Sequence, residues 1–307
     1  MSTPKPANGA GARVPEHMSD AHVMDYTILN CGHPIVSKHE VVIGDLPVYV
    51  HGLDGIQGTE TVQFIAHGWA NQAKTMDHMA SGLIGEIHRM EAASGKPRVR
   101  DVLVVTLDQR NHGERVRVKV TNFDIEPTRL ITMATIVTGG KVDHQYAMDF
   151  LPAVLFPDGE REIVEFMSVG ISMGGHVTWW LLREDPRIKI GVPMITLPSE
   201  ALGGLLTARV AKLKAQGINT YMPESIKQGF YNPTTQQYKG KKILSVHGKL
   251  DKLIPLRFAQ PKLDEILAQD SSGKDIQQHI QEGKGHAVSP EMVSKAAEWV
   301  YIHGFCS

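Results

Sequence analysis

Short apolar runs alternate with longer amphipathic segments along most of this chain of 307 residues. A continuous apolar run such as 102–107 is typical of a parallel strand that is covered on both faces. Residues 41–50 indicate a hairpin that turns at Gly44 and Asp45. Further strands are predicted at 61–66, 163–169, 188–195, 242–248 and 275–281. Because strands and helices alternate, the pattern predicts the α/β class, a mostly parallel central sheet with helices on both faces.

The helices are predicted from apolar residues that recur three and four positions apart. Within 76–90 this spacing produces one apolar face, formed by Met76, Met79, Leu83 and Ile87. Other helices are predicted at 143–156, 177–183, 256–269 and 290–304. The last of these begins with Ser289, a natural N-cap, followed by proline at the first helical position.

Three stretches fit this alternation poorly. Pro152 is expected to bend or break the helix at 143–156, because proline has no N–H to donate. Pro193 weakens the second half of the strand at 188–195 for the same reason. Residues 115–140 show no clear periodicity, so no element is assigned to them.

Residues 197–238 interrupt the alternation of strands and helices. Their first part has one apolar helical face, and prolines and aromatic residues follow; the face consists of Leu202, Leu205, Leu206, Val210 and Leu213. We interpret this segment as a small lid over a site, and an ordinary packed insertion is the alternative. The core of the domain would then comprise residues 31–196 and 239–307. Residues 1–30 begin with a Pro-, Gly- and Ala-rich stretch and are interpreted as a flexible tail.

The composition narrows the class of protein. Hydrophobic residues make up 42% of the chain and charged residues 21%, which is ordinary for a globular domain. Lysine plus arginine (32) nearly equals aspartate plus glutamate (33), which argues against a protein built to bind nucleic acid or an anionic membrane. No stretch predicts a signal peptide or a membrane span, so a cytoplasmic location is expected.

The two cysteines, Cys31 and Cys306, have no metal-ligand spacing. A reduced intracellular protein explains them most simply, and a disulfide between the two ends of the chain is the alternative. No metal and no cofactor are predicted. A homodimer stays open, because nothing in the sequence bears on oligomeric state.

The sequence from Gly170 to His176 contains the pattern G-x-S-x-G with Ser172 at its centre. A predicted strand precedes it and a predicted helix follows it, which is the context of a nucleophile elbow. Such a turn needs small residues on both sides of the serine, because strand and helix pass close together there. The N-terminus of the following helix would direct backbone N–H groups towards a developing oxyanion.

Other polar residues also follow predicted strands directly. The sequence His67-Gly68-Trp69 follows the strand at 61–66, residues 108–113 (Asp-Gln-Arg-Asn-His-Gly) follow 102–107, and Asp251 and His286 follow the last two strands. The carboxyl ends of parallel strands meet at one edge of a sheet, and ligands bind there. We therefore expect these residues and Ser172 to converge.

Over residues 40 to 305 the chain resembles the α/β-hydrolases. The similarity rests on H-G-W, D-Q-R-N-H-G, G-I-S-M-G-G-H, H-G-K-L-D-K-L-I-P and G-K-G-H, and on the order serine, acid, histidine. It implies the α/β-hydrolase fold and a serine hydrolase of the carboxylesterase type. The G-I-S-M-G-G-H-V-T-W run is also similar to fungal esterase-like proteins near the dienelactone-hydrolase and prolyl-oligopeptidase branches.

The resemblance implies a role for each matching residue. Ser172 would be the nucleophile, His286 the general base and acid, and Asp251 the residue that orients the histidine. The backbone N–H groups of Trp69 and Met173 would form the oxyanion hole. The substrate pocket would include His67, Gly68, Trp69, His176, Leu205 and Leu206. His176 and His112 are rival histidines, but packing beneath the site and orienting a loop are the roles expected of them.

The expected substrate is a small-molecule ester, lactone or thioester cleaved through an acyl-enzyme intermediate. Two alternatives stay open. One is an enzyme that cleaves amides or peptides with the same three residues. The other is a non-catalytic protein that binds a ligand on a hydrolase scaffold.

Overall fold

The computed structural model describes residues 25–56, 60–68, 71–95, 100–118, 127–230 and 237–306. Its centre is one eight-stranded sheet in the order β1-β2-β4-β3-β5-β6-β7-β8. The pairings from β4 to β8 are all parallel, and β1 and β2 extend the sheet as an antiparallel hairpin. The strands are β1 (Lys38–Ile43), β2 (Leu46–His51), β3 (Glu60–Ala66), β4 (Asp101–Thr106), β5 (Ile163–Ile171), β6 (Ile188–Met194), β7 (Lys242–Gly248) and β8 (Ile276–Gln281).

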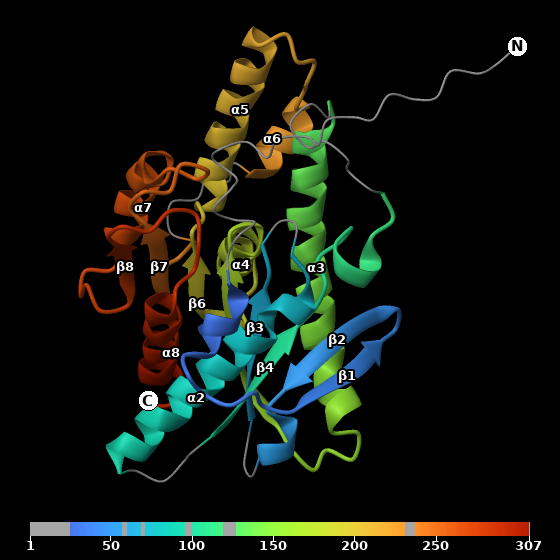
Figure 1. Ribbon diagram of the computed structural model, residues 1–307, viewed down its shortest axis with the longest axis vertical. Coiled ribbons are helices and arrows are strands. Elements are labelled where there is room, and N and C mark those ends of the chain that lie inside the picture. Colours follow the sequence, from blue (N-terminus) through green and yellow to red (C-terminus); the bar gives the residue numbers. More distant parts are fainter. Residues whose placement is uncertain are drawn as a thin grey trace, which may run out of the picture.

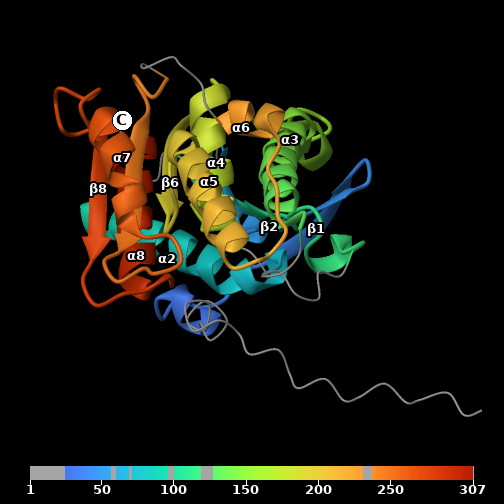
Figure 2. The same cartoon turned by 90° about the horizontal axis from the view of Figure 1, so that it is seen from above.

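Helices cover both faces of this sheet, as Figures 1 and 2 show. One face carries α2 (Asp77–Ser94) and α8 (Pro290–Gly304), and the other carries α3 (Arg129–Leu155) and α4 (Met173–Glu184). The remaining helices are α5 (Ser199–Ala215), α6 (Glu224–Phe230) and α7 (Gln260–Leu267), and the short 3-10 helices are η1 (Tyr26–Asn30), η2 (Leu53–Gly55), η3 (Ala73–Met76), η4 (Gly113–Arg115) and η5 (Leu256–Phe258). The sequence prediction of a mostly parallel sheet between two helical layers is confirmed.

Two separate apolar cores follow from this layering. Beneath α2 and α8 the core includes Met79, Leu83 and Ile87, which the helical spacing had indicated. Beneath α3 and α4 it includes Phe64, Leu103 and Trp179. All six residues of β4 are buried, as expected for a strand covered on both faces.

Two prolines are accommodated inside their predicted elements. Pro193 lies inside β6 and pairs with Gly170 of β5. The ladder between β6 and β7 pairs Gly191 with Ile243 and resumes at Met194, so the missing N–H of Pro193 falls where that ladder is interrupted. Pro152 does not break its helix: it stands in the last turn of α3, which ends at Leu155, so the hydrogen bond that its missing N–H removes is near the end of the helix.

The unassigned stretch 115–140 contains the start of α3. This helix has 27 residues and begins at Arg129, and residues 119–126 lie outside the described part of the chain. The sequence shows no clear helical face there because α3 is buried on several sides, and it contains the pair Gly139 and Gly140. Side chains of the loop after β4 occupy the space that those two glycines leave.

The predicted tail of residues 1–30 is too long. Residues 1–24 lie outside the described part of the chain, but Tyr26–Asn30 form η1, which packs against α2 and α8. Leu29 of η1 has no exposed surface, so burial of an apolar side chain fixes this segment to the domain.

The predicted lid contains α5 and α6, which Figure 1 shows above the sheet. The base of α5 is packed into the core, since Leu202 and Leu206 are almost fully buried. Several hydrogen bonds tie the segment to the domain; for example, Arg209 Nη2 donates to the Leu253 carbonyl at 2.8 Å, and the Thr220 hydroxyl donates to the Pro127 carbonyl at 3.1 Å. That this segment acts as a lid stays a proposal.

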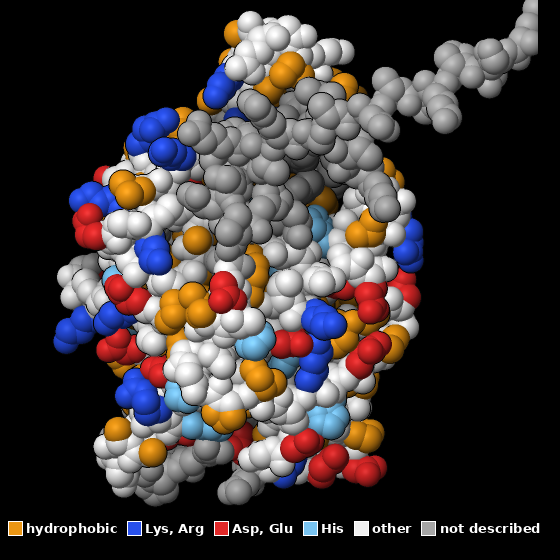
Figure 3. All heavy atoms as spheres, in the orientation of Figure 1, with side chains coloured by type: hydrophobic (Ala, Val, Ile, Leu, Met, Phe, Trp, Pro, Cys, Tyr) orange, Lys and Arg blue, Asp and Glu red, His pale blue; other side chains and the backbone are white. Residues whose placement is uncertain are grey.

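Two observations concern membrane-spanning helices and the charge of the surface. No helix in the described part of the chain is long and apolar enough to cross a bilayer. On the face drawn in Figure 3, acidic and basic side chains are interspersed among uncharged ones.

Candidate active site

Ser172 occupies a strained turn between β5 and α4. Its φ of 53° and ψ of −111° place a non-glycine residue outside the regions that L-amino acids prefer. Such a conformation costs on the order of 1–3 kcal/mol and persists only where the surrounding structure enforces it. Here the Ser172 N–H donates to the Met194 carbonyl at 2.9 Å, and the side chain stays partly exposed. The backbone at Ser172 therefore has the predicted geometry of a nucleophile elbow.

The glycines around Ser172 allow strand and helix to approach each other. A methyl group on Gly170 would overlap the Gly174 carbonyl and the Thr178 hydroxyl. One on Gly174 would overlap the backbone of Ala66, the last residue of β3. The G-x-S-x-G pattern thus reflects close packing between β3, β5 and α4, and this packing enforces the strained turn.

Three side chains from distant parts of the sequence form a hydrogen-bonded chain at this edge of the sheet. His286 Nε2 lies 2.8 Å from Ser172 Oγ, and His286 Nδ1 lies 2.7 Å from Asp251 Oδ2. Both His286 and Asp251 are buried. An aspartate next to Nδ1 fixes the proton on that nitrogen, so Nε2 is the acceptor that faces the serine hydroxyl.

The acid is itself held by backbone donors. Asp251 Oδ1 accepts the N–H of Leu253 at 2.9 Å and that of Ile254 at 2.8 Å. Its second oxygen, Oδ2, is the one that faces His286. The two oxygens of one carboxylate are thus divided between fixing the loop and orienting the imidazole.

The loops that carry the acid and the histidine are joined directly. The Leu250 N–H donates to the Lys284 carbonyl at 2.7 Å. A methyl group on Gly248 would overlap the Gly285 carbonyl, so only glycine lets the two loops pass this closely. The H-G-K-L-D and G-K-G-H segments therefore explain the approach of Asp251 to His286.

The segment after β3 is fixed by the loop after β4. His67 Nε2 accepts the Gln109 N–H at 2.9 Å, so its Nδ1 carries the proton and donates to the Gly68 carbonyl at 2.8 Å. Asp108 Oδ1 accepts the Ala73 N–H at 2.7 Å, on the far side of the same segment. His67 has no exposed surface, so it supports this segment from beneath instead of lining an open pocket.

The loop after β4 is in turn anchored to α3. Asp143 of α3 forms ion pairs with Arg110 at 2.9 Å and with Arg115 at 2.7 Å. His112 Nδ1 lies 3.0 Å from the Arg110 carbonyl, which agrees with its expected role in orienting the loop. The sequence indicated the D-Q-R-N-H-G motif but not its anchor, because Asp143 stands in a different element.

The remaining predicted site residues occupy different positions. Met173 is the first residue of α4, immediately after Ser172. Gly68 lies against the nucleophile, since a Cβ built on it would stand 3.5 Å from Ser172 Cβ. Trp69, predicted both as an oxyanion donor and as a pocket wall, lies outside the described residues.

Three predicted pocket residues are packed inside the protein. His176 is buried, and its Nδ1 lies 2.9 Å from the Thr196 hydroxyl and 3.1 Å from the Leu197 carbonyl, so it holds the loop after β6. Leu205 and Leu206 belong to the core beneath α3 and α4. Contact of these side chains with a substrate stays a prediction.

The lowered pKa values of four buried histidines predict how the free energy of unfolding depends on pH. Burial lowers the pKa of His51, His176 and His247 to about 4 and that of His67 to about 3. The unfolded chain binds these protons near pH 6.5, so their contribution to stability is complete above that pH and is lost as pH falls towards 4. We expect urea denaturation to show the free energy of unfolding at pH 5 reduced by at least about 2 kcal/mol relative to pH 7.5.

Substitution of one of these histidines provides the control. His247→Gln removes a titrating group, so its unfolding free energy should decline less steeply between pH 7.5 and 5 than that of the wild type. A wild-type urea midpoint that stays constant over this range would show that the buried imidazoles do not stay neutral.

Two further features bear on ligands. In the described ranges, no group of three or more His, Cys, Asp or Glu side chains is arranged to hold a metal ion. A cavity of about 320 Å³ lies at the start of β4, far from Ser172 along the strand direction, and its lining includes Ser37, Gly52, Ile84 and Asp101. None of the predicted pocket residues that the structure describes lines it.

Comparison with known proteins identifies the fold. No protein-family model matches the chain, and no curated protein matches its sequence. Among solved structures, TT1662 from Thermus thermophilus matches with a TM-score of 0.64 at 16% identity, over 88% of this chain and 99% of that one. A cold-adapted esterase from an Arctic intertidal metagenomic library matches with a TM-score of 0.52 at 15% identity, over 86% and 92%.

A larger protein matches as well. The acylaminoacyl peptidase of Pyrococcus horikoshii has a TM-score of 0.57 at 15% identity; the match covers 91% of this chain but 43% of the peptidase. At such identities a likeness shows the fold alone. Together with the observed strand order and elbow, it shows that this chain has the α/β-hydrolase fold.

Proposed function

We propose that this protein is a serine hydrolase of the carboxylesterase type, which cleaves an ester, lactone or thioester of a small molecule through an acyl-enzyme intermediate. One observation carries the proposal: the strained, partly exposed Ser172 is hydrogen-bonded to His286, which is hydrogen-bonded to Asp251. A serine hydroxyl is a weak nucleophile on its own, and this arrangement is one that activates it.

In the first half of the reaction, Ser172 Oγ attacks the carbonyl carbon of the substrate while its proton moves to His286 Nε2. Asp251 stabilises the imidazolium that forms, because its Oδ2 accepts the Nδ1 proton. Collapse of the tetrahedral intermediate breaks the bond to the leaving group, which takes the proton from His286. The acyl group then remains on Ser172 Oγ.

In the second half, a water molecule replaces the leaving group. His286 Nε2 accepts a proton from this water as its oxygen attacks the acyl carbon, and returns the proton to Ser172 Oγ when the acid product departs. Every proton passes through the same imidazole nitrogen, so the reaction needs no further acid or base.

The oxyanion is proposed to form at the N-terminus of α4. The Met173 N–H follows the nucleophile directly and lies where the helix dipole favours negative charge. The second donor is proposed to be the Trp69 N–H, from the sequence motif alone. Loss of one such donor typically raises the barrier by about 3 kcal/mol.

Whether the protein cleaves esters or amides can be decided by comparing its kcat/KM on two matched substrates. We expect the protein to hydrolyse a short-chain p-nitrophenyl ester at least about 100-fold faster, in kcat/KM, than the matched p-nitroanilide. The amide leaving group needs more assistance than a phenolate, and no structural feature of the described residues singles out a peptide substrate. An anilide rate within tenfold of the ester rate would favour the amide-cleaving alternative. Absence of turnover on both would favour the ligand-binding one.

A further inference from the structure

The second half of α3 carries a row of large apolar side chains on its exposed side. Four such residues stand four positions apart, and each keeps between 38% and 47% of its surface exposed: Val142, Tyr146, Phe150 and Val154. We name these four residues the α3 stripe. Because residues four apart lie on one face of a helix, their side chains form a continuous row. The ring centroids of Tyr146 and Phe150 are 4.9 Å apart.

The charged side chains of this half of α3 are paired within the chain. Lys141 pairs with Glu184, and Asp149 pairs with Arg187, beside the stripe. Asp143 is buried and pairs with the loop after β4. The face of a helix that meets water normally carries the polar and charged residues, but here the exposed row is apolar. It therefore resembles a face that another protein surface covers.

The size of the α3 stripe distinguishes it from ordinary exposed apolar residues. Ile302 is 48% exposed, but no other large apolar residue of α8 is exposed beside it. The α3 stripe exposes roughly 300–400 Å² of contiguous apolar surface, which is comparable with the largest patch on a typical monomer. Figures 1 and 2 show α3 at the edge of the domain remote from α7 and α8, where a second molecule can approach it.

The order of the four residues is symmetric. Along α3 the stripe reads aliphatic, aromatic, aromatic, aliphatic. A two-fold axis midway between Tyr146 and Phe150 would place Val142 opposite Val154 of a second copy, and Tyr146 opposite Phe150. Each residue of such a contact meets a different residue that meets it in return, which is the property of a two-fold interface. Rows of residues four apart also interdigitate when two helices cross at about −50°, the commonest crossing angle in globular proteins.

The available area matches a weak and reversible dimer. Covering the α3 stripe on two copies removes roughly 600–800 Å² of apolar surface, and the polar side chains beside it bring the total to about 1,000–1,200 Å². This total lies at the lower end of the range for specific interfaces. We therefore expect a dissociation constant in the micromolar range.

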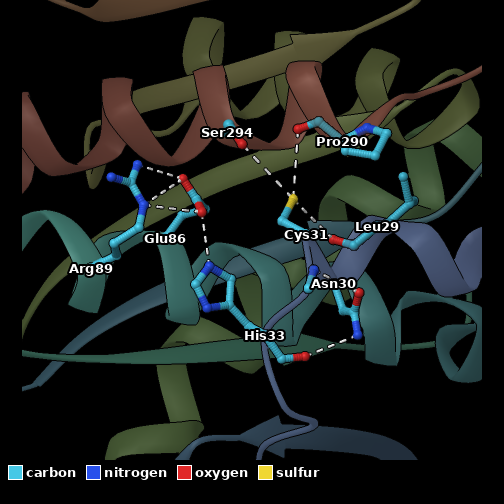
Figure 4. Close-up of polar contacts among 9 residues, drawn as sticks. Leu29, Asn30, Cys31, His33, Glu86, Arg89, Pro290 and Ser294 are labelled. Carbon is cyan, nitrogen blue, oxygen red and sulfur yellow. Dashed lines mark hydrogen bonds and ion pairs between the residues drawn. The ribbon is translucent and has the colours of Figure 1, made fainter.

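The first 24 residues of the chain are another candidate for covering the stripe, and they fit it less well. They join the domain next to η1, which packs against α2 and α8 on the opposite face of the sheet. Figure 4 shows how the chain is fixed there: Cys31 Sγ lies 3.6 Å from the Pro290 carbonyl, and His33 Nε2 lies 2.8 Å from Glu86 Oε1. Residues 1–24 also contain no Leu, Ile, Phe, Tyr or Trp, so they offer few apolar side chains.

We propose that the α3 stripe is a dimerisation surface, which binds the stripe of a second copy of this chain about a two-fold axis between Tyr146 and Phe150. The stripe lies towards the amino ends of the parallel strands, because α3 ends shortly before β5 begins. Ser172 follows the carboxyl end of β5, at the other edge of the sheet. The contact therefore lies away from the candidate active site and does not depend on the proposed hydrolase function.

The test is sedimentation velocity of the full chain from about 2 to about 200 μM, because a micromolar dimer dissociates at the lower end and forms at the upper end. Phe150→Glu and Tyr146→Lys each place a charge in the α3 stripe. Ile302→Lys is the matched control, since it places a charge at an equally exposed apolar position on α8. Hydrogen exchange of wild-type peptides covering 139–156, at both concentrations, shows whether the stripe becomes covered and does not depend on any variant.

We expect the wild type to change from monomer to dimer across this range, with slower exchange in 139–156 at the higher concentration. Phe150→Glu and Tyr146→Lys should each weaken the dimer at least about tenfold, because each leaves an unpaired charge in an apolar contact. An equimolar mixture of the two variants should dimerise again, since the two-fold register places the introduced lysine opposite the introduced glutamate. Ile302→Lys should dimerise like the wild type.

A wild type that stays monomeric up to about 200 μM would overturn the inference. Undiminished dimerisation of Phe150→Glu, or an equal loss in Ile302→Lys, would also reject the α3 stripe as the contact. A mixture of Phe150→Glu and Tyr146→Lys that stays monomeric would reject the two-fold register and with it the inference. Equal protection of 139–156 at both concentrations would mean that another segment of the same chain covers the stripe. None of these results requires turnover, so a protein that hydrolysed no ester would contradict the proposed function alone.

Discussion

Ser172→Ala should abolish ester hydrolysis, with kcat reduced at least about 10⁴-fold and the fold intact. The substitution removes the only atom that attacks the substrate in the proposed mechanism. It leaves the hydrogen bond between His286 and Asp251 and the backbone donors of the loop in place. The stability of the protein should change little, because alanine at φ 53° is strained no more than serine is. Turnover of a short p-nitrophenyl ester and the thermal unfolding midpoint measure the two effects.

Ser168→Ala is the matched control for this variant. Ser168 stands four residues earlier, inside β5, and its hydroxyl lies 2.8 Å from that of Thr178, on the buried side of α4. Loss of this hydroxyl should reduce stability by about 1 kcal/mol and leave kcat within a few-fold of the wild type. Equal activity losses in both variants would mean that any disturbance of β5 inactivates the protein, and the special role of Ser172 would be rejected.

Gly174→Ala should destabilise the domain by at least about 3 kcal/mol, the largest effect on stability that we expect from adding one methyl group. The added Cβ would overlap the carbonyl oxygen and carbonyl carbon of Ala66. These are backbone atoms at the end of the central strand β3, so they cannot move aside without disturbing the ladders on both sides. Chemical denaturation measures the loss, and residual folded protein should also show reduced ester turnover.

For Gly204→Ala we expect the opposite change in the free energy of unfolding, measured in the same way. Gly204 lies on the exposed side of α5, and a Cβ there would meet no atom within 4 Å. Alanine in a helix interior is favoured over glycine, so this variant should be more stable by about 0.5–1 kcal/mol. If both substitutions changed stability by similar small amounts, close packing of the elbow would not be what holds Ser172 in its strained conformation.

The sequence was most informative where a local pattern and its structural context coincide. Ser172, Asp251 and His286 each directly follow a strand that could be recognised from its own composition, and a parallel sheet brings the ends of its strands together. The hydrogen-bonded chain of these three side chains agrees with that reasoning. The roles of these residues in catalysis stay proposals.

Other parts of the site could not be predicted, for identifiable reasons. The packing of η1 against α2 and α8 joins segments that no periodicity relates, and η1 lies in a segment whose composition indicates a tail. The start of α3 was missed because its Gly139-Gly140 pair lowers helix propensity. The side chains of Arg110 and Gln109, from the loop after β4, lie where Cβ atoms on Gly139 and Gly140 would be. This is a tertiary contact, and the local sequence does not reveal it.

The predicted pocket residues illustrate a further limit. His67 and His176 were assigned to the pocket because they stand close in sequence to motifs of the site. Both side chains are buried and use their ring nitrogens to hold neighbouring loops. Their positions in the sequence indicate that they lie near Ser172. Burial and hydrogen bonding decide whether such a side chain lines a pocket or holds a neighbouring loop.

Labelling with a fluorophosphonate tests the central claim most directly, because this reagent phosphonylates a serine only where a base activates the hydroxyl. The folded protein should gain one phosphonyl group by intact mass, peptide mapping should place it on Ser172, and Ser172→Ala should remain unlabelled. Folded wild-type protein that takes up no phosphonyl group, or takes it up at another residue, would contradict the proposal that Ser172 is an activated nucleophile.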